Sequence, residues 1–322
     1  MPVILRVDKV PPSLAEELAR DLNIDPATLR YRTLYEYSKL SAEDLQAIAG
    51  EIQVILASGE SKVESSLIEQ LPELKLIAVF GVGYDGVDIH AAFSRNIQVT
   101  NTPDILTDDV ADLGIALMLN VSRRINGAQK FIECGGWLSG AYPPSTKVSG
   151  GRLGIVGFGR IGRAVARRAQ GFAMRIACFD RNPVNSSEVT YYADLLELAK
   201  NSDVLMVCAS AGKESQKLIN REVLAALGAN GILINIARGS VVDEEALVAA
   251  ITQGTLGGAG LDVFANEPHI PPALLNRDEV VITPHIGSAT RATRAAMAKL
   301  VIDNIAAFYA GEALLTPVAP PR

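Results

Sequence analysis

Short apolar runs alternate with helix-period segments along most of the chain. Near the start, the runs 54–57, 76–81 and 97–100 predict strands, and stretches such as SSLIEQL between them predict helices. From residue 152 onward the alternation is stronger. The strands predicted there are 152–157, 175–180, 203–209, 231–237, 258–263 and 280–283.

These strands are apolar nearly throughout and do not alternate between apolar and polar residues. Strands of this kind, separated by helices, are typical of a parallel sheet whose two faces are both covered. We therefore predict an α/β fold with two Rossmann-like domains, each a doubly wound parallel sheet.

Two segments have the composition of domain junctions. The segment 99–109 contains a cluster of turn residues and then a helix start, for which Thr107 is the expected N-cap. The segment 283–290 leads into a long last helix, expected at 289–310. We therefore predict a substrate (catalytic) domain at 1–100, an inserted dinucleotide-binding domain at 101–289, and a return to the substrate domain at 290–322. We expect the chemistry in a crevice at the two hinges.

Composition narrows the class of protein. The chain has 322 residues, a net charge of −6 and no basic run, so we expect no nucleic-acid partner. Its longest apolar runs, such as 114–121, are shorter than the roughly 20 residues of a membrane span, so no membrane association is expected. Cys134, Cys178 and Cys208 are widely spaced, which is typical of reduced thiols in a cytoplasmic protein. We expect no metal site either.

A glycine-rich turn follows the predicted strand 152–157. Gly157, Gly159 and Gly162 have the spacing G-x-G-x-x-G and open a predicted helix at 160–172. Glycines at these positions permit a tight turn, close approach of the backbone to a pyrophosphate, and close packing of helix on strand. The phosphates would lie at the N-terminus of the helix, where free N–H groups and the dipole attract anions. This context predicts a dinucleotide site.

Two adjacent residues bear on the choice between NAD and NADP. Asp180 closes the predicted strand 175–180, where a carboxylate accepts hydrogen bonds from the adenosine ribose hydroxyls and repels a 2′-phosphate. Arg181 comes next and is able to bind that phosphate instead. We favour NAD(H), with NADP(H) as the alternative.

Three ionisable residues follow the last three predicted strands. Arg238, Glu267 and His285 each come at or beyond the carboxyl end of one of them. Because the carboxyl ends of parallel strands lie along one edge of a doubly wound sheet, we expect these side chains to converge. Taken alone, each has a structural interpretation: a surface ion pair, a turn residue, or a satisfied loop histidine. We interpret His90, in a predicted helix, and His269, in a surface-like loop, as structural.

The three residue types suit the reduction of a 2-oxo acid by a nicotinamide. Histidine is the natural proton donor near neutral pH, so His285 is the candidate acid for the carbonyl oxygen. A carboxylate bonded to its other ring nitrogen, here Glu267, would fix the tautomer and keep the imidazole protonated. The guanidinium of Arg238 has the planar set of donors that binds a carboxylate, and its charge favours a polarised carbonyl.

Longer stretches make the sequence similar to a known family. The chain resembles the D-isomer-specific 2-hydroxyacid dehydrogenases, and within them the hydroxypyruvate/glyoxylate and hydroxyphenylpyruvate reductases. The matching stretches are FGVGYDGVD, VTNTPDILTDDVADLGIALML, GIVGFGRIG, INREVLAALGANGILINIARGSVVDEEAL, GTLGGAGLDVFANEP and TPHIGSAT. The resemblance implies a reductase of small 2-oxo acids to D-2-hydroxy acids. Glyoxylate and hydroxypyruvate are the first candidates, and arylpyruvates or sugar-derived 2-oxo acids come next.

The resemblance also implies roles for individual residues. Arg238, Glu267 and His285 fall on the family's catalytic set, and the first and last of these also contact substrate. Val82 and Gly83 fall where backbone N–H groups hold the substrate carboxylate. The residues that fall on cofactor positions are Arg160 and Ile161 in the pyrophosphate loop and Thr107, Cys208, Ala237 and Asp262 along the nucleotide and nicotinamide. The helix that starts at TDDVADL matches the family's dimerisation region, so a homodimer is expected.

Two other functions use the same fold. A formate dehydrogenase-like enzyme needs no proton donor, but that type pairs a glutamine with the histidine, whereas this chain has Glu267. A nucleotide-sensing corepressor-like interaction protein keeps a similar triad but usually carries long extra tails, which we do not find after the last helix. Hydroxyphenylpyruvate reductase-like members tend to use NADPH and to have a small or neutral residue where this chain has Asp180, so the resemblance leaves the cofactor open.

Overall fold

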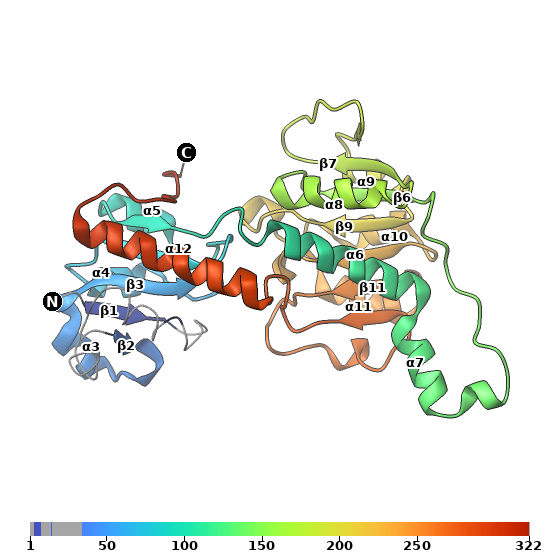
Figure 1. Ribbon diagram of the computed structural model, residues 1–322, viewed down its shortest axis with the longest axis horizontal. Helices are drawn as coiled ribbons and strands as arrows, with labels where there is room; N and C mark the ends of the chain where they lie inside the picture. Colours follow the sequence, from blue (N-terminus) through green and yellow to red (C-terminus); the bar gives the residue numbers. More distant parts are fainter. Residues whose placement is uncertain (1–2, 8–13, 15–33, 322) are drawn as a thin grey trace. The chain divides into compact units, whose positions relative to one another are not determined.

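The computed structural model describes residues 3–7, 14 and 34–321 of the chain (Figure 1). The chain forms two compact units. One consists of Met1–Leu106 together with Thr290–Arg322, and we call it the terminal unit; the other, Thr107–Ala289, is the central unit. The chain therefore leaves the terminal unit after Leu106 and returns to it at Thr290.

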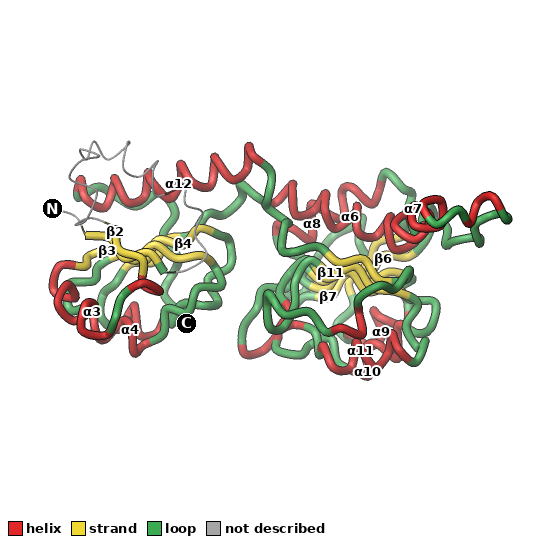
Figure 2. Tube along the Cα trace, turned by 90° about the horizontal axis from the view of Figure 1, so that it is seen from below, coloured by secondary structure: helices red, strands yellow, loops and turns green. Residues whose placement is uncertain are grey.

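The terminal unit is built on a parallel sheet in the order β2-β1-β3-β4-β5. Its strands are β1 (Val3–Arg6), β2 (Leu34–Glu36), β3 (Ile52–Ser58), β4 (Leu76–Phe80) and β5 (Gln98–Thr100). Its described α-helices are α3 (Ala42–Ile48), α4 (Ser65–Gln70), α5 (Ile89–Ser94) and α12 (Arg291–Ala310). Figure 2 shows α12 on one face of the sheet and α3 and α4 on the other. Both faces of β3 and β4 are therefore covered, as their apolar sequences predicted.

The central unit is built on a larger parallel sheet in the order β12-β11-β10-β9-β6-β7-β8. Its strands are β6 (Arg152–Val156), β7 (Arg175–Phe179), β8 (Thr190–Tyr191), β9 (Val204–Val207), β10 (Ile232–Asn235), β11 (Gly258–Leu261) and β12 (Val280–Ile282). Its α-helices are α6 (Thr107–Arg123), α7 (Ile125–Glu133), α8 (Arg160–Gln170), α9 (Leu195–Lys200), α10 (Arg221–Leu227) and α11 (Glu244–Thr252). In Figure 2, α6 and α8 cover one face of this sheet, and α9, α10 and α11 cover the other.

The strand order of the central sheet reverses beside β6. From β6 the chain first builds outward through β7 and β8, and then returns to add β9 on the other side of β6. Ligands of doubly wound sheets bind outside the carboxyl ends of the strands at such a switch point. The predicted α/β fold with doubly wound parallel sheets is confirmed, and the glycine loop predicted to bind a dinucleotide follows β6 at this switch point.

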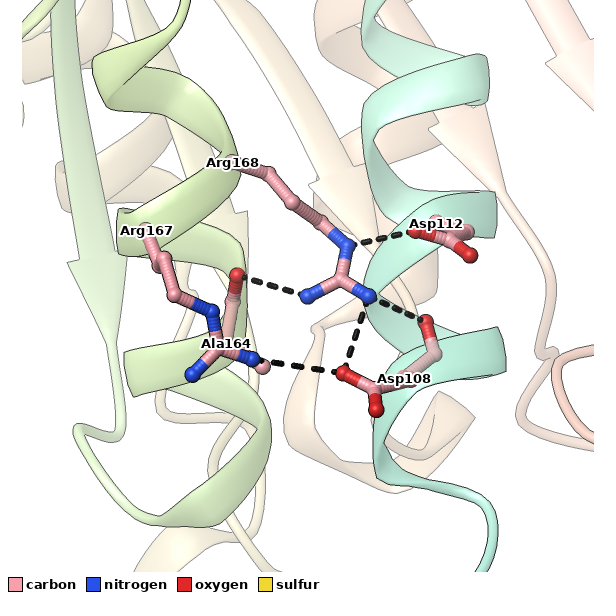
Figure 3. A network of polar contacts seen from close by, with 5 residues as sticks. All are labelled: Asp108, Asp112, Ala164, Arg167 and Arg168. Atoms are coloured by element: carbon pink, nitrogen blue, oxygen red, sulfur yellow. Dashed lines mark hydrogen bonds and ion pairs between the residues drawn. The ribbon is translucent and has the colours of Figure 1, made fainter.

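Two helices on the same face are joined by a cluster of charged groups (Figure 3). Arg168 of α8 donates hydrogen bonds to Asp112 and to the carboxylate and main-chain oxygen of Asp108, both on α6, and to Ala164 of its own helix. Arg167 contacts the same Asp108 carboxylate, but its side chain is 69% exposed, compared with 22% for Arg168. Arg168 therefore fixes α8, which begins at the glycine loop, against α6.

An arm projects from the central unit beyond its sheet (Figure 1). It comprises α7 and the short 3-10 helix η3 (Gly136–Leu138), and it carries several exposed apolar side chains. These side chains are Ile125, Ile132, Trp137 and Leu138. No helix in the described part of the chain is long and apolar enough to cross a membrane.

Candidate active site

His285 lies in a tight turn just after β12. Its backbone has a φ of 53°, a left-handed conformation that few residues other than glycine adopt. Its N–H donates to the main-chain oxygens of Asp262 (2.9 Å) and Thr283 (3.1 Å). These hydrogen bonds hold the backbone of His285. A strained left-handed conformation of this kind persists only where surrounding contacts enforce it.

The carboxylate of Asp262, directly after β11, makes several of the hydrogen bonds that hold this turn. Its side chain is buried, with 2% of its surface exposed. The carboxylate accepts hydrogen bonds from the Thr283 hydroxyl at 2.6 Å and from the N–H groups of Ile286 and Gly287, each at 2.8 Å. Burial raises the pKa of Asp262, and these hydrogen bonds act in the opposite direction. One buried carboxylate is therefore hydrogen-bonded to residues on both sides of His285, namely Thr283 before it and Ile286 and Gly287 after it.

Glu267 is the side-chain partner of His285. One carboxylate oxygen, Oε2, lies 3.0 Å from Nδ1 of the imidazole. The other, Oε1, accepts the N–H of Phe264 at 2.9 Å, which orients the carboxylate. Both side chains are partly buried. Because Glu267 engages Nδ1, a proton exchanged with a substrate would be carried at Nε2.

Arg238 follows β10, the strand next to β11, and its loop packs against the loop of Glu267. A Cβ added at Gly239 would come within 2.0 Å of the Phe264 carbonyl group, so only glycine allows this approach. Asn235, 1% exposed, accepts the N–H of Ala237 through its side chain and donates to the main-chain oxygen of Arg238. The structure thus brings Glu267 and His285 into direct contact and places the base of Arg238 at the neighbouring strand end.

The glycine loop has the shape that a dinucleotide requires. Gly157 has a φ of 90°, and a Cβ there would lie 2.5 Å from the Cα of Ala209. A Cβ at Gly162 would lie 2.2 Å from the main-chain oxygen of Gly157, so helix and strand are packed as closely as glycine permits. Gly159, immediately before α8, faces open space instead. A tight turn, a close helix and room at the helix N-terminus fit a bound pyrophosphate.

Asp180 and Arg181 are directed differently. The Asp180 carboxylate accepts the N–H of Phe158 in the glycine loop at 2.8 Å and that of Asn182 at 3.1 Å. Arg181 pairs with Glu214 at 2.8 Å, and these two side chains are 76% and 75% exposed. Asp180 is therefore attached to the glycine loop itself, whereas Arg181 lies in a solvent-exposed ion pair of little energetic weight.

The remaining predicted residues lie in separate parts of the two units. Thr107 is the first residue of α6 and not its N-cap, so the predicted helix start was wrong by one residue. Cys208 follows β9, and burial raises the pKa of its thiol to about 12. Ala237 precedes Arg238, while Arg160 and Ile161 form the first turn of α8; Val82 and Gly83 follow β4 in the terminal unit.

The residues that hold the site in place were not predicted from the sequence. Asn235 is a lone polar residue within the apolar run GILINIA, and this was an available signal. The sequence did not indicate a role for Thr283, because its hydroxyl lies next to Asp262 only as a result of the pairing of β12 with β11. The resemblance placed Asp262 along the nicotinamide but did not indicate its hydrogen bonds to the histidine turn.

A doubly wound central unit with a dinucleotide loop and a carboxylate–histidine pair defines a nicotinamide-dependent oxidoreductase. Residues 115–287 match the sequence profile of the D-isomer specific 2-hydroxyacid dehydrogenase, NAD binding domain. The chain belongs to this family, whose members transfer a hydride between a nicotinamide cofactor and a 2-oxo acid/2-hydroxy acid pair.

Individual relatives support the assignment over nearly the whole chain. The chain is 45% identical to a hydroxyphenylpyruvate reductase of Plectranthus scutellarioides, over 90% of this chain and 93% of that protein. It is 41% identical to a glyoxylate/hydroxypyruvate reductase A of Arabidopsis thaliana, over 95% of each. The structure is similar to the NADPH-dependent glyoxylate/hydroxypyruvate reductase of Sinorhizobium meliloti in complex with NADP and malonate. That comparison gives a TM-score of 0.88 and 40% identity over 100% of this chain and 98% of the other.

Proposed function

We propose that the protein reduces glyoxylate and hydroxypyruvate to the corresponding 2-hydroxy acids. The observation that carries this proposal is the 3.0 Å contact between Glu267 and His285 in the turn held by Asp262. When bound, the nicotinamide cofactor supplies the hydride for the carbonyl carbon. His285 delivers the proton from Nε2 to the carbonyl oxygen, and Glu267 stabilises the imidazolium before that transfer.

In this proposal the substrate carboxylate is bound by Arg238 and by the backbone N–H groups of Val82 and Gly83. A guanidinium near the carbonyl oxygen also stabilises the negative charge that develops there as the hydride arrives. Turnover of a panel of 2-oxo acids (glyoxylate, hydroxypyruvate and 4-hydroxyphenylpyruvate) tests the substrate class. We expect the first two to have the highest kcat/KM, and a preference for the third would favour the arylpyruvate activity of the Plectranthus relative.

We propose NAD(H) as the preferred cofactor. Its pyrophosphate would lie on Gly157, Gly159, Arg160, Ile161 and Gly162, and its ribose hydroxyls on Asp180. The positions proposed along the rest of the nucleotide are Thr107, Cys208, Ala237 and Asp262. The Asp180 carboxylate, fixed by the glycine loop, would repel a 2′-phosphate. We expect a lower KM for NADH than for NADPH, and a tenfold preference for NADPH would reject this choice.

The role of His285 is tested by substitution. His285→Ala should lower kcat for reduction by about 10²–10⁴-fold, the usual contribution of general acid catalysis. His90→Ala is the matched control, because His90 lies on the surface of α5. An unchanged kcat in His285→Ala would mean that the proton comes from another group.

We further propose a homodimer assembled through α6 and the arm. The supporting observation is the exposed apolar surface of the arm, on which the Leu138 side chain is 94% exposed. Light scattering after size-exclusion chromatography should give twice the chain mass of 34.2 kDa. Leu138→Asp should shift the protein toward the monomer, and a monomeric wild type would reject the proposal.

A further inference from the structure

The loop after β4 presents two consecutive peptide groups in a defined orientation. The main-chain oxygen of Gly81 accepts the N–H of Thr102 at 2.8 Å, and that of Val82 accepts the side-chain amide of Asn101 at 2.9 Å. In a planar trans peptide the N–H points opposite to the C=O. The N–H groups of Val82 and Gly83 are therefore directed away from residues 101 and 102. Neither donates a hydrogen bond to any residue that the structure describes.

Asn101 is in turn held by the segment after α12. The hydroxyl of Thr316 donates to the main-chain oxygen of Asn101 at 2.7 Å, although the two residues are 215 positions apart. The segment also pairs with the edge of the sheet, since Val318 donates its N–H to the oxygen of Val99 at 2.8 Å. Residues 315–318, which we call the tail segment, thus lie directly behind Asn101.

The tail segment is fixed by one buried side chain of α12. Asn304 is 1% exposed, and its amide oxygen accepts the N–H groups of Leu315 (3.0 Å) and Thr316 (3.1 Å). Its amide nitrogen donates to the Thr316 hydroxyl at 3.0 Å and to the oxygen of Leu300 at 2.8 Å. The amide is therefore fully satisfied, and a buried, satisfied network of this kind is rigid.

We propose that Asn304, Thr316 and Asn101 form a relay of positioning residues that aims the Val82 and Gly83 N–H groups at the substrate carboxylate. This inference rests on the proposed function, which assigns the carboxylate to those two N–H groups. Donors that are held in place before binding need no reorganisation when an anion arrives. The tail segment thereby contributes to substrate affinity without touching the substrate.

The relay is tested most sharply at Thr316, whose hydroxyl joins its two halves. Thr316→Val keeps the shape of the side chain but removes the donor to Asn101 and the acceptor for Asn304. We expect KM for glyoxylate to rise about threefold to tenfold, the range that corresponds to one hydrogen bond. We expect kcat and the Kd of NADH to stay within about twofold. Thr316→Ser keeps the hydroxyl and should restore the wild-type KM.

A second pair of measurements separates positioning from general destabilisation. Ser41→Ala removes the capping hydroxyl of α3 in the same unit, which destabilises that unit but leaves the relay intact. KM should not change in this control. Combining Thr316→Val with Asn101→Ala should raise KM no more than Asn101→Ala alone, because both act through the same carbonyl of Val82.

Binding of oxalate to the enzyme–NADH complex, measured by calorimetry, supplies a readout independent of turnover. Its Kd should rise in Thr316→Val by the same factor as KM. An unchanged oxalate Kd and KM in Thr316→Val would overturn the relay while leaving the proposed function intact. A wild type that turns over no 2-oxo acid would reject the proposed function, and the oxalate Kd values would still decide whether the relay orients an anion site.

Discussion

At the scale of single residues, the site depends on carboxylates that orient a histidine. Glu267 acts on the imidazole of His285, whereas Asp262 acts on the backbone that carries it. The left-handed conformation of His285 would be unfavourable without those contacts. The protein therefore fixes its proposed proton donor twice, once by the ring and once by the turn.

Asp262→Asn should lower kcat/KM by about 10- to 100-fold, because misplacing a catalytic group by a small distance is costly. An asparagine offers one acceptor oxygen, so its NH₂ would face the N–H of Gly287 or Ile286. Asp203→Asn is a suitable control, since that carboxylate binds Arg152 at the start of β6. Wild-type kcat/KM in Asp262→Asn would show that the turn keeps its shape without the carboxylate.

The same substitution should change how stability depends on pH. Because burial raises the pKa of Asp262, the folded protein binds this proton more tightly than the unfolded chain. Its contribution to stability is therefore fully present below the unfolded pKa of about 4 and is lost as pH rises through the folded pKa. Urea titrations give the unfolding free energies of wild type and of Asp262→Asn. The difference, wild type minus variant, should fall as the pH rises from the unfolded pKa of Asp262 through its folded pKa. A difference that rises with pH would contradict the direction of the shift.

The cysteines should differ sharply in reactivity. Burial raises the pKa of Cys178 to about 11 and that of Cys208 to about 12, so both thiols stay protonated at pH 8. Cys134 is exposed at the end of α7. Ellman's reagent should therefore modify one thiol quickly in the native protein and all three after denaturation. Rapid reaction of more than one native thiol would mean that a strand end opens.

Residues of the site differ in how far the sequence could predict them. Glu267 and His285 could be paired because each follows a strand of one sheet, and parallel topology brings strand ends together. The competition between Asp180 and Arg181 could not be resolved, because the direction of each side chain depends on Phe158 and Glu214. Bonds such as Thr316 to Asn101 leave no periodic signal at all.

At the scale of elements, apolar runs predicted β3–β7 and β9–β12, and most of these strands are buried along nearly their whole length. The exceptions are β5, an edge strand, and β7, which is buried only in part. The sequence did not indicate β8, which has two residues and forms only an edge. The arm was not predicted either. Ile125, Ala128 and Ile132 of α7 do recur at helical spacing, but Ile125 and Ile132 are exposed, and α7 buries only Gly127. Prediction was therefore best where burial was most complete.

The stability of the contact between α6 and α8 should depend on the planar guanidinium of Arg168. Arg168→Lys should lower stability by about 1 kcal/mol, because an ammonium cannot reach at once the carboxylates of α6 and the Ala164 oxygen of α8 that the guanidinium reaches. Arg167→Lys is the matched control on the neighbouring position and should change stability by less than about 0.5 kcal/mol. Chemical denaturation measures both values. Equal losses in the two variants would contradict the role given to Arg168.

At the scale of the whole molecule, the two units differ in how the chain builds them. The central unit is one continuous segment with its own apolar core, which includes Leu205, Leu233 and Leu247. We expect a fragment of residues 107–289 to fold cooperatively and to show the circular dichroism of an α/β protein. A fragment of residues 1–106 is the comparison, and it should not fold cooperatively because α12 and the tail segment are missing. A cooperative transition in that shorter fragment would reject this distinction.

The helix α12 lies on β4 in the terminal unit but follows the entire central unit in the sequence. During translation, the face of β4 that α12 covers therefore stays bare until the ribosome has synthesised the central unit. At about 5–20 residues per second, this interval lasts about 10 to 40 seconds. The nascent chain thus exposes an apolar sheet face throughout this interval.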